Sequence, residues 1–235
     1  MGDSRGVCVI TGVGAGTGAA LCRRFAAGGY RVAMLARSAE RLADLEREIP
    51  GSRGYPTDVT DSPALRASLG RIRAELGAPR VVLHNAGNAS FGDLFQVSEG
   101  QLEEAWRINT LALLVLAQET APAMIEQGGG AILVTGATAS LRGGASFAAF
   151  APAKAAQRSL AQSMARRLGP QGVHVALVIV DGVIDMPFTR KLLADRPDDQ
   201  FLRPEAIAET FFHLAQQERS AWSAELDLRP FGEKW

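Results

Sequence analysis

The segment Thr11-Gly12-Val13-Gly14-Ala15-Gly16-Thr17-Gly18 decides the fold of this chain. It follows a short apolar run, Val7–Thr11, and opens a helical pattern that ends at Gly28. A glycine-rich turn between a strand and a helix brings backbone N–H groups close to the phosphates of a dinucleotide. The alternative is an ordinary strand–helix turn packed with small residues. We expect a pyrophosphate site formed by Gly12, Gly14, Gly16, Thr17 and Gly18.

Outward from this turn, apolar runs of strand length alternate with helical patterns. Strands are predicted at Val7–Thr11, Arg31–Ala36, Gly54–Thr57, Arg80–His84, Ala131–Thr135, Val173–Val180 and Glu225–Leu228. Helices are predicted at Gly16–Gly28, Ala39–Ile49, Ser62–Leu76, Glu99–Glu126, Phe150–Leu168 and Leu202–Gln217. This alternation indicates parallel βαβ units in a single α/β domain. The predicted fold is a three-layer, doubly wound parallel sheet (a Rossmann fold), with its ligand at the carboxyl ends of the strands.

One segment, Ile184–Gln200, fits no strand and holds two prolines among mixed charges. Such an insertion after the sixth strand is typical of a loop that covers a site. We therefore expect a substrate lid at about residues 184–202.

Composition excludes several classes of function. The 235 residues include 25 Lys and Arg against 25 Asp and Glu, which argues against a nucleic-acid or anionic-membrane surface. The N-terminus lacks the apolar stretch of a signal peptide, and no uninterrupted apolar run reaches about 18 residues. We expect a soluble cytoplasmic protein with no membrane or nucleic-acid partner. Cys8 and Cys22 are expected to be buried thiols, and no metal site is predicted.

The end of the second strand distinguishes the two nicotinamide cofactors. NAD sites place an acid there for the ribose 2′-hydroxyl, whereas NADP sites supply a base for the 2′-phosphate. The chain reads Leu35-Ala36-Arg37-Ser38, with no acid. Arg37 can fork onto a phosphate, although an exposed surface arginine is the alternative. The sequence therefore favours NADP(H) over NAD(H).

Five motifs together resemble those of the short-chain dehydrogenase/reductase family over essentially the whole chain. They are the glycine-rich turn, Asp58-Val59, His84-Asn85-Ala86-Gly87, Asn109, and Lys154 four residues after Phe150. The resemblance implies that Asp58 and Val59 flank the adenine. It also implies that Asn85, Ala86 and Gly87 support the cofactor ribose, that Lys154 holds the nicotinamide ribose, and that Gly182 and Val183 complete the cofactor site.

The resemblance also implies four catalytic residues, of which this chain retains two, Asn109 and Lys154. The position of the family's acid/base tyrosine holds Phe150, and that of its serine holds Ala137. No shift of the alignment restores the tyrosine, because Tyr30 and Tyr55 are the only tyrosines. Hydride delivery to a carbonyl builds an alkoxide that needs a nearby proton donor. The proton-transfer site therefore lacks its usual donors.

Three interpretations account for a cofactor site that keeps its motifs beside a proton-transfer site that lacks its usual donors. The preferred one is an NADP(H)-dependent oxidoreductase for a small, hydrophobic carbonyl, alcohol or related substrate, with a displaced proton donor. Its candidate donors are Thr138, Ser140, Ser146, His84, and Lys154 acting through a water held with Asn109. The second is a non-redox cyclase or isomerase that uses Asp181, Asp185 or His84. The third is an NADP(H)-binding sensor or scaffold without turnover.

The expected substrate pocket is mostly apolar. Its predicted wall is Ala89, Ser90, Phe91, Thr138–Leu141, Phe147 and Ile184–Leu193, and Phe150 and Phe188 add to its aromatic character. The long helix is apolar on nearly all sides over Leu111–Ala117, so something must bury it. In the resembled family this helix and the one after Phe150 form the dimer interface, which implies a homodimer or homotetramer.

Overall fold

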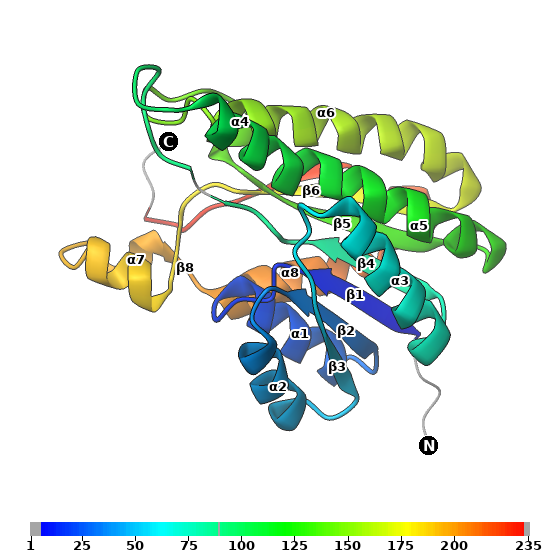
Figure 1. The fold of residues 1–235 in the computed structure, drawn as a ribbon. Coiled ribbons are helices and arrows are strands. Elements are labelled where there is room, and N and C mark those ends of the chain that lie inside the picture. Colours follow the sequence, from blue (N-terminus) through cyan, green and yellow to red (C-terminus); the bar gives the residue numbers. More distant parts are fainter. Residues whose placement is uncertain (1–5, 89, 233–235) are drawn as a thin grey trace.

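The computed structural model describes residues 6–88 and 90–232, and it has one central parallel sheet (Figure 1). The sheet has seven strands in the order β3-β2-β1-β4-β5-β6-β9. They are β1 (Val7–Thr11), β2 (Arg31–Ala36), β3 (Ser52–Pro56), β4 (Pro79–His84), β5 (Gly130–Ala137), β6 (Val173–Val180) and β9 (Glu225–Leu228). The order reverses direction between β1 and β4, as in a doubly wound fold, so the predicted fold class is confirmed.

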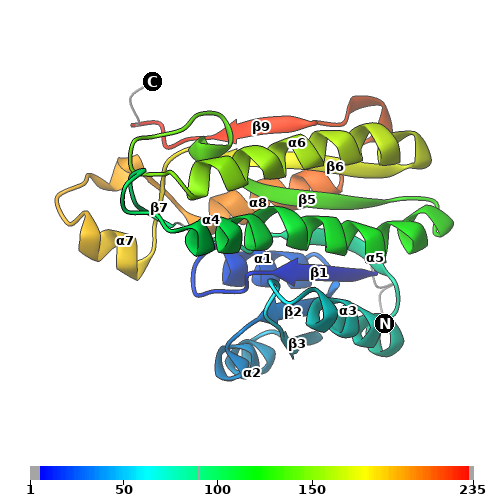
Figure 2. The same cartoon turned by 45° about the horizontal axis from the view of Figure 1, so that its top comes forward.

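Helices cover both faces of the sheet. One face carries α1 (Thr17–Ala27), α2 (Ala39–Glu48) and α8 (Pro204–Ala215). The other carries α3 (Ser62–Leu76), α4 (Glu99–Trp106), α5 (Ala112–Glu126) and α6 (Phe150–Leu168); in Figure 2, α4 and α5 lie end to end in a row between α3 and α6. Successive residues of β1 enter opposite cores, with Val9 in one and Ile10 in the other. The central strands β1 and β6 are largely apolar because both of their faces are buried, whereas the edge strands β3 and β9 are partly exposed and more polar.

The long helix predicted at Glu99–Glu126 is interrupted at its centre. A π-helical turn, Arg107–Leu111, separates α4 from α5. This turn holds Asn109, and the N–H of Ala112 bonds to the carbonyl of Arg107. Single π-turns of this kind are frequent at functional sites. The other predicted elements of the sheet and its helices agree with the structure to within two residues.

The segment Glu99–Glu126 also has the length and composition of a membrane span, with a mean hydropathy of 1.3 over its most apolar stretch. Polar residues interrupt the apolar runs of this segment, so a search for an uninterrupted apolar run of membrane-spanning length does not detect it. Within the fold, 61% of that stretch is buried. Burial in the core of this domain accounts for the apolar composition.

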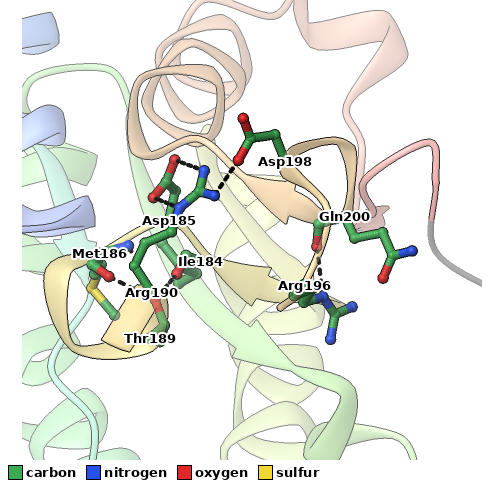
Figure 3. Close-up of polar contacts among 8 residues, drawn as sticks. All are labelled: Ile184, Asp185, Met186, Thr189, Arg190, Arg196, Asp198 and Gln200. Atoms are coloured by element: carbon green, nitrogen blue, oxygen red, sulfur yellow. Dashed lines mark hydrogen bonds and ion pairs between the residues drawn. The ribbon is translucent and has the colours of Figure 1, made fainter. Parts of the chain in front are cut away.

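A small two-stranded sheet bounds the segment Ile184–Gln200, so of the residues predicted to fit no strand only Ile184 lies in one. β7 (Val183–Ile184) pairs in parallel with β8 (Phe201–Leu202), and α7 (Pro187–Leu192) lies between them. Figure 3 shows how Arg190 links the segment: its guanidinium donates twice to Asp185, at 2.7 Å each, and once to Asp198. Strands of two residues are too short to leave a readable pattern in the sequence.

Candidate functional site

The glycine-rich turn after β1 packs directly against the loop that follows β4. Gly12 has a φ of +70°, and a Cβ there would lie 2.5 Å from the backbone N and Cα of Ala86. A Cβ on Gly18 would lie 2.5 Å from the carbonyl oxygen of Gly12. By contrast, a Cβ on Gly14 would meet nothing within 4 Å. Gly12 and Gly18 therefore allow the tight turn, and Gly14 faces open space.

The N-terminus of α1 fits a bound phosphate. The hydroxyl of Thr17 is buried there and has no hydrogen-bond partner within the described ranges. The helix has no side-chain cap at Gly16. A buried, unpartnered polar atom beside uncapped N–H groups is what an anionic pyrophosphate would satisfy. The side chain of Met186, from the segment after β6, lies against Gly16 at the edge of this turn.

A cavity of about 290 Å³ continues from the turn across the ends of β1, β2 and β4. It is lined by Gly12–Gly14, Leu35–Ser38, Arg41, Thr57–Val59, Ala86, Gly87 and Ile108. The structure thus brings together most of the residues predicted to bind the nucleoside. The amide of Asn85 supports the rim, since its Nδ2 donates to the Gly12 carbonyl at 3.0 Å. Gly182 and Val183 do not line this cavity.

Two arginines share the mouth of this cavity at the end of β2. Arg37 was predicted from the sequence, whereas Arg41, one turn into α2, was not. Ser38 caps α2, because its Oγ accepts from the N–H of Arg41 at 3.2 Å. The position of Arg41 three residues after a capping serine was the signal in the sequence that could have placed it near Arg37. Both side chains are exposed, and neither forms a salt bridge with any described residue.

Asp58 lies opposite the two arginines in the same cavity. Partial burial raises the pKa of its carboxyl, but hydrogen bonds from Thr60 and the charge of Arg37 outweigh that effect. The net result is a pKa below the ordinary value for aspartate. Asp58 is therefore ionised at neutral pH and acts as a hydrogen-bond acceptor.

Lys154 and Asn109 converge beside Gly87, at the carboxyl ends of the central strands. The Lys154 ammonium donates to the carbonyl of Thr135 at 2.8 Å and to the Oε1 of Gln157 at 3.1 Å. The Nδ2 of Asn109 donates to the Ala105 carbonyl at 2.8 Å, and its Oδ1 has no partner among the described residues. A Cβ on Gly87 would lie 3.1 Å from that oxygen and 3.7 Å from Lys154 Nζ.

Burial dominates the electrostatics of Lys154. The residue is only 4% exposed, and desolvation lowers the pKa of its ammonium to about 7. An amine with such a pKa is partly protonated at neutral pH, so it can exchange protons with a ligand. The ring centroid of Phe150 lies 5.9 Å from Nζ and offers no hydroxyl.

Two of the other predicted donors, Thr138 and His84, are held by protein partners. Thr138 donates its hydroxyl proton to the carboxylate of Asp181, which also pairs with Arg229 at 2.7 Å. The buried Ser140 Oγ accepts from the N–H of Ala137 at 3.1 Å. His84 is fully buried, and its pKa falls to about 3 because of desolvation and the nearby charge of Lys154. The Ser140 hydroxyl proton has no acceptor among the described residues and Ser146 is exposed, whereas Lys154 is the candidate that lies beside Gly87 and Asn109.

Three phenylalanines form a row that leads from the surface to Lys154. The rings of Phe91 and Phe147 lie 5.5 Å apart, and those of Phe147 and Phe150 lie 6.2 Å apart. A β-bridge between Gly92 and Phe147 joins the two loops. Phe188, on α7, is exposed and outside this row. Ala89, also predicted for the pocket wall, lies outside the described residues.

Comparison with known proteins agrees with this geometry. The profile of the family described as short chain dehydrogenase matches residues 6–197. The chain belongs to the short-chain dehydrogenase family. A probable galactose dehydrogenase GalD from Rhizobium meliloti (strain 1021) is 34% identical over 193 residues, covering 80% of this chain and 75% of that protein.

Two solved short-chain dehydrogenase structures have the same fold. One, from Rhodopseudomonas palustris, has a TM-score of 0.82 at 35% identity and covers 97% of this chain and 100% of its own. The other, a metagenomic short-chain oxidoreductase in complex with NADP, has a TM-score of 0.85 at 28% identity, with 98% and 99% covered. Family membership supports binding of a nucleotide cofactor and a small-molecule substrate.

The turn geometry predicts opposite results for two neighbouring glycines of this short-chain dehydrogenase. Gly12→Ala is expected to lower the free energy of unfolding by about 2–5 kcal/mol, because it adds left-handed backbone strain to a backbone clash. Gly14→Ala is the matched control and should change stability by less than about 0.5 kcal/mol. Urea unfolding of both variants measures the difference. Equal stability would show that the turn relaxes away from Ala86.

Proposed function

We propose that this protein is an NADP(H)-dependent oxidoreductase for a small, hydrophobic carbonyl or alcohol substrate, in which Lys154 replaces the missing hydroxyl donor. The observation that carries the proposal is the buried Lys154 ammonium beside Gly87 and the unpartnered Asn109 Oδ1. It lies at the carboxyl ends of the strands, where ligands of doubly wound sheets bind.

The cofactor half of the proposal is supported by charge. Two guanidinium groups without salt bridges to described residues flank the cavity at the end of β2, where a 2′-phosphate would lie. Arginine binds phosphate through paired, charge-assisted hydrogen bonds. Thr17 and the uncapped α1 N-terminus would hold the pyrophosphate. When bound, the cofactor supplies or accepts the hydride.

The proton half follows from Lys154. Hydride addition to a carbonyl carbon breaks the C=O π bond and leaves an alkoxide oxygen. Lys154 then donates one Nζ proton to that oxygen and becomes a neutral amine, which solvent reprotonates. Because desolvation brings the pKa of Lys154 to about 7, its acid strength matches neutral pH. Alcohol oxidation runs the same transfer in reverse, with the neutral amine as base.

Two surrounding features belong to the same proposal. The segment of residues 184–202 is a lid over the substrate, with the Phe91–Phe147–Phe150 row as the apolar wall. An apolar groove of about 370 Å³ on α4 and α6 is the subunit contact of a homodimer or homotetramer. It is lined by Glu99, Leu102, Glu103, Trp106, Pro152 and Ala153. A cytoplasmic location fits the two free, buried cysteines.

The proposal is tested by two measurements on the purified protein. The first is titration with NADPH, followed by tryptophan and nicotinamide fluorescence. The second follows NADPH oxidation with a panel of aldehydes and ketones between pH 6 and 9. We expect reduction that declines as pH rises through about 7, because Lys154 loses its proton. Binding without turnover would favour a sensor, and failure to bind either nucleotide would overturn the redox function.

Arg37→Ala and Arg41→Ala are each expected to weaken NADPH binding by about 10–100-fold and to leave NADH binding nearly unchanged. The reason is the loss of charge-assisted hydrogen bonds to a group that NADH lacks. The dissociation constants of both nucleotides measure this. Arg47→Ala, an exposed change farther along α2, is the control and should alter neither. Equal losses for the two nucleotides would remove the 2′-phosphate assignment.

A further inference from the structure

Gln157 is a fully buried polar residue that no sequence motif singled out. It lies one helical turn after Lys154 on α6, with no exposed surface. Its Oε1 accepts from the Lys154 ammonium at 3.1 Å, and its Nε2 donates to the backbone carbonyl of Asn109 at 2.9 Å. The side-chain amide therefore bridges the two residues that remain of the family's catalytic set.

The orientation of this amide is fixed by its neighbours. A carbonyl oxygen only accepts and an ammonium only donates. Turning the amide over would face its NH₂ group toward Lys154 and its oxygen toward the Asn109 carbonyl, which loses both hydrogen bonds. Gln157 can thus satisfy both partners in one orientation only.

His84 completes the same network from β4. Its Nε2 lies 3.1 Å from the Ile108 carbonyl and 3.2 Å from that of Asn109, so this nitrogen carries the proton. Its Nδ1 then accepts from the Thr11 hydroxyl at 3.1 Å, which in turn accepts from the N–H of Ala86 at 3.3 Å. Apart from Asn109 Oδ1 and one N–H of Lys154, the polar groups of this buried network are paired among the described residues, and all are neutral except Lys154.

We propose that Gln157 is a positioning residue that aims the Lys154 ammonium at the reacting oxygen. This inference rests on the proposed function. An ammonium has three N–H donors. Thr135 and Gln157 accept two of them, which leaves the third for a ligand atom bound beside Gly87. The two acceptors fix the direction of the third donor.

A neutral amide also keeps Lys154 acidic. A carboxylate at this position would stabilise the ammonium and raise the pKa of Lys154, making it a poorer acid at neutral pH. An apolar residue would remove one acceptor and lower that pKa further. The titratable group facing Lys154 in this network is His84, which is neutral because burial lowers its pKa to about 3.

The test measures Lys154 directly. The chain has only three lysines, Lys154, Lys191 and Lys234. Lysine labelled with ¹³C and ¹⁵N, in a Lys191→Arg and Lys234→Arg background, gives one titrating NMR signal without cofactor or substrate. The near-isosteric Gln157→Glu is expected to raise its midpoint by about one pH unit or more. Gln157→Leu is expected to lower it, and Gln162→Glu, on the exposed face of α6, to leave it in place.

Turnover provides the second readout. Where the wild type reduces a carbonyl, Gln157→Leu should lower kcat by about 10-fold or more with little change in KM, because positioning acts on the chemical step. An unmoved Lys154 midpoint in both Gln157 variants, or an equal shift in Gln162→Glu, would overturn the role of Gln157. Absence of carbonyl reduction in the wild type overturns the proposed function and leaves the titration result standing.

Discussion

Phe150→Tyr combined with Ala137→Ser is expected to raise NADPH-dependent carbonyl reduction by about 10²–10⁴-fold, the usual contribution of a positioned acid. The Phe150 ring centroid is 5.9 Å from Lys154 Nζ, so a hydroxyl on that ring would lie near the ammonium. The positive charge would lower the pKa of the new phenol and favour proton transfer. Initial rates over the aldehyde and ketone panel measure the gain.

A matched control separates this effect from a general change in the aromatic row. Phe147→Tyr adds the same hydroxyl to the neighbouring ring, 6.2 Å from that of Phe150 and one step farther from Lys154. It should not increase the rate. If the double variant binds NADPH normally and reduces no carbonyl in the panel, the pocket lacks more than a proton donor, and the oxidoreductase proposal loses its chemical basis.

The fold could be predicted from the sequence because its strands are buried on both faces. In such a sheet the apolar runs stand out against charged helices, and the bounds of β1, β2 and β6 were predicted without error. The glycine turn could be read because its residues are adjacent in the chain, so their spacing reports their geometry. The cavity beside it also takes residues that follow β2, β3 and β4.

Features that depend on contacts between distant segments could not be predicted. The π-turn at Asn109, Arg107–Leu111, changes the helical register by one residue within a continuous helical segment, and no glycine or proline marks it. Arg41 reaches the cavity because α2 begins at Ala39, with Ser38 as its N-cap, which places Arg41 in the first turn of the helix. Gln157 looks like an ordinary polar helix residue until α6 packs on β5 and the Asn109 carbonyl. The one available signal was a polar side chain on the buried face of that helix.

Lys154→Met is expected to abolish a rise in stability that the wild-type protein shows between pH 7 and 8.5. In the unfolded chain Lys154 keeps its proton up to a pKa near its ordinary value of 10.5, whereas in the fold burial lowers that pKa to about 7. Between these values the unfolded state binds one more proton. The free energy of unfolding therefore increases with pH, by about 1.4 kcal/mol per pH unit. Below pH 7 both states are protonated and this slope disappears.

Urea unfolding of the wild type and of Lys154→Met at pH 6, 7, 7.5, 8 and 8.5 measures this difference. The buried Cys8 and Cys22 have raised pKa values in the fold, so they lower stability at higher pH, but they do so in both proteins and cancel. Lys191→Met, an exposed change on α7, should keep the wild-type slope. Parallel curves for wild type and Lys154→Met would mean that the ammonium keeps its ordinary pKa inside the fold. Lys154 would then be too weak an acid for the proposed transfer at neutral pH. The expected slope would instead show that the fold holds a buried proton donor at a cost in stability, at a position where methionine would pack at less cost.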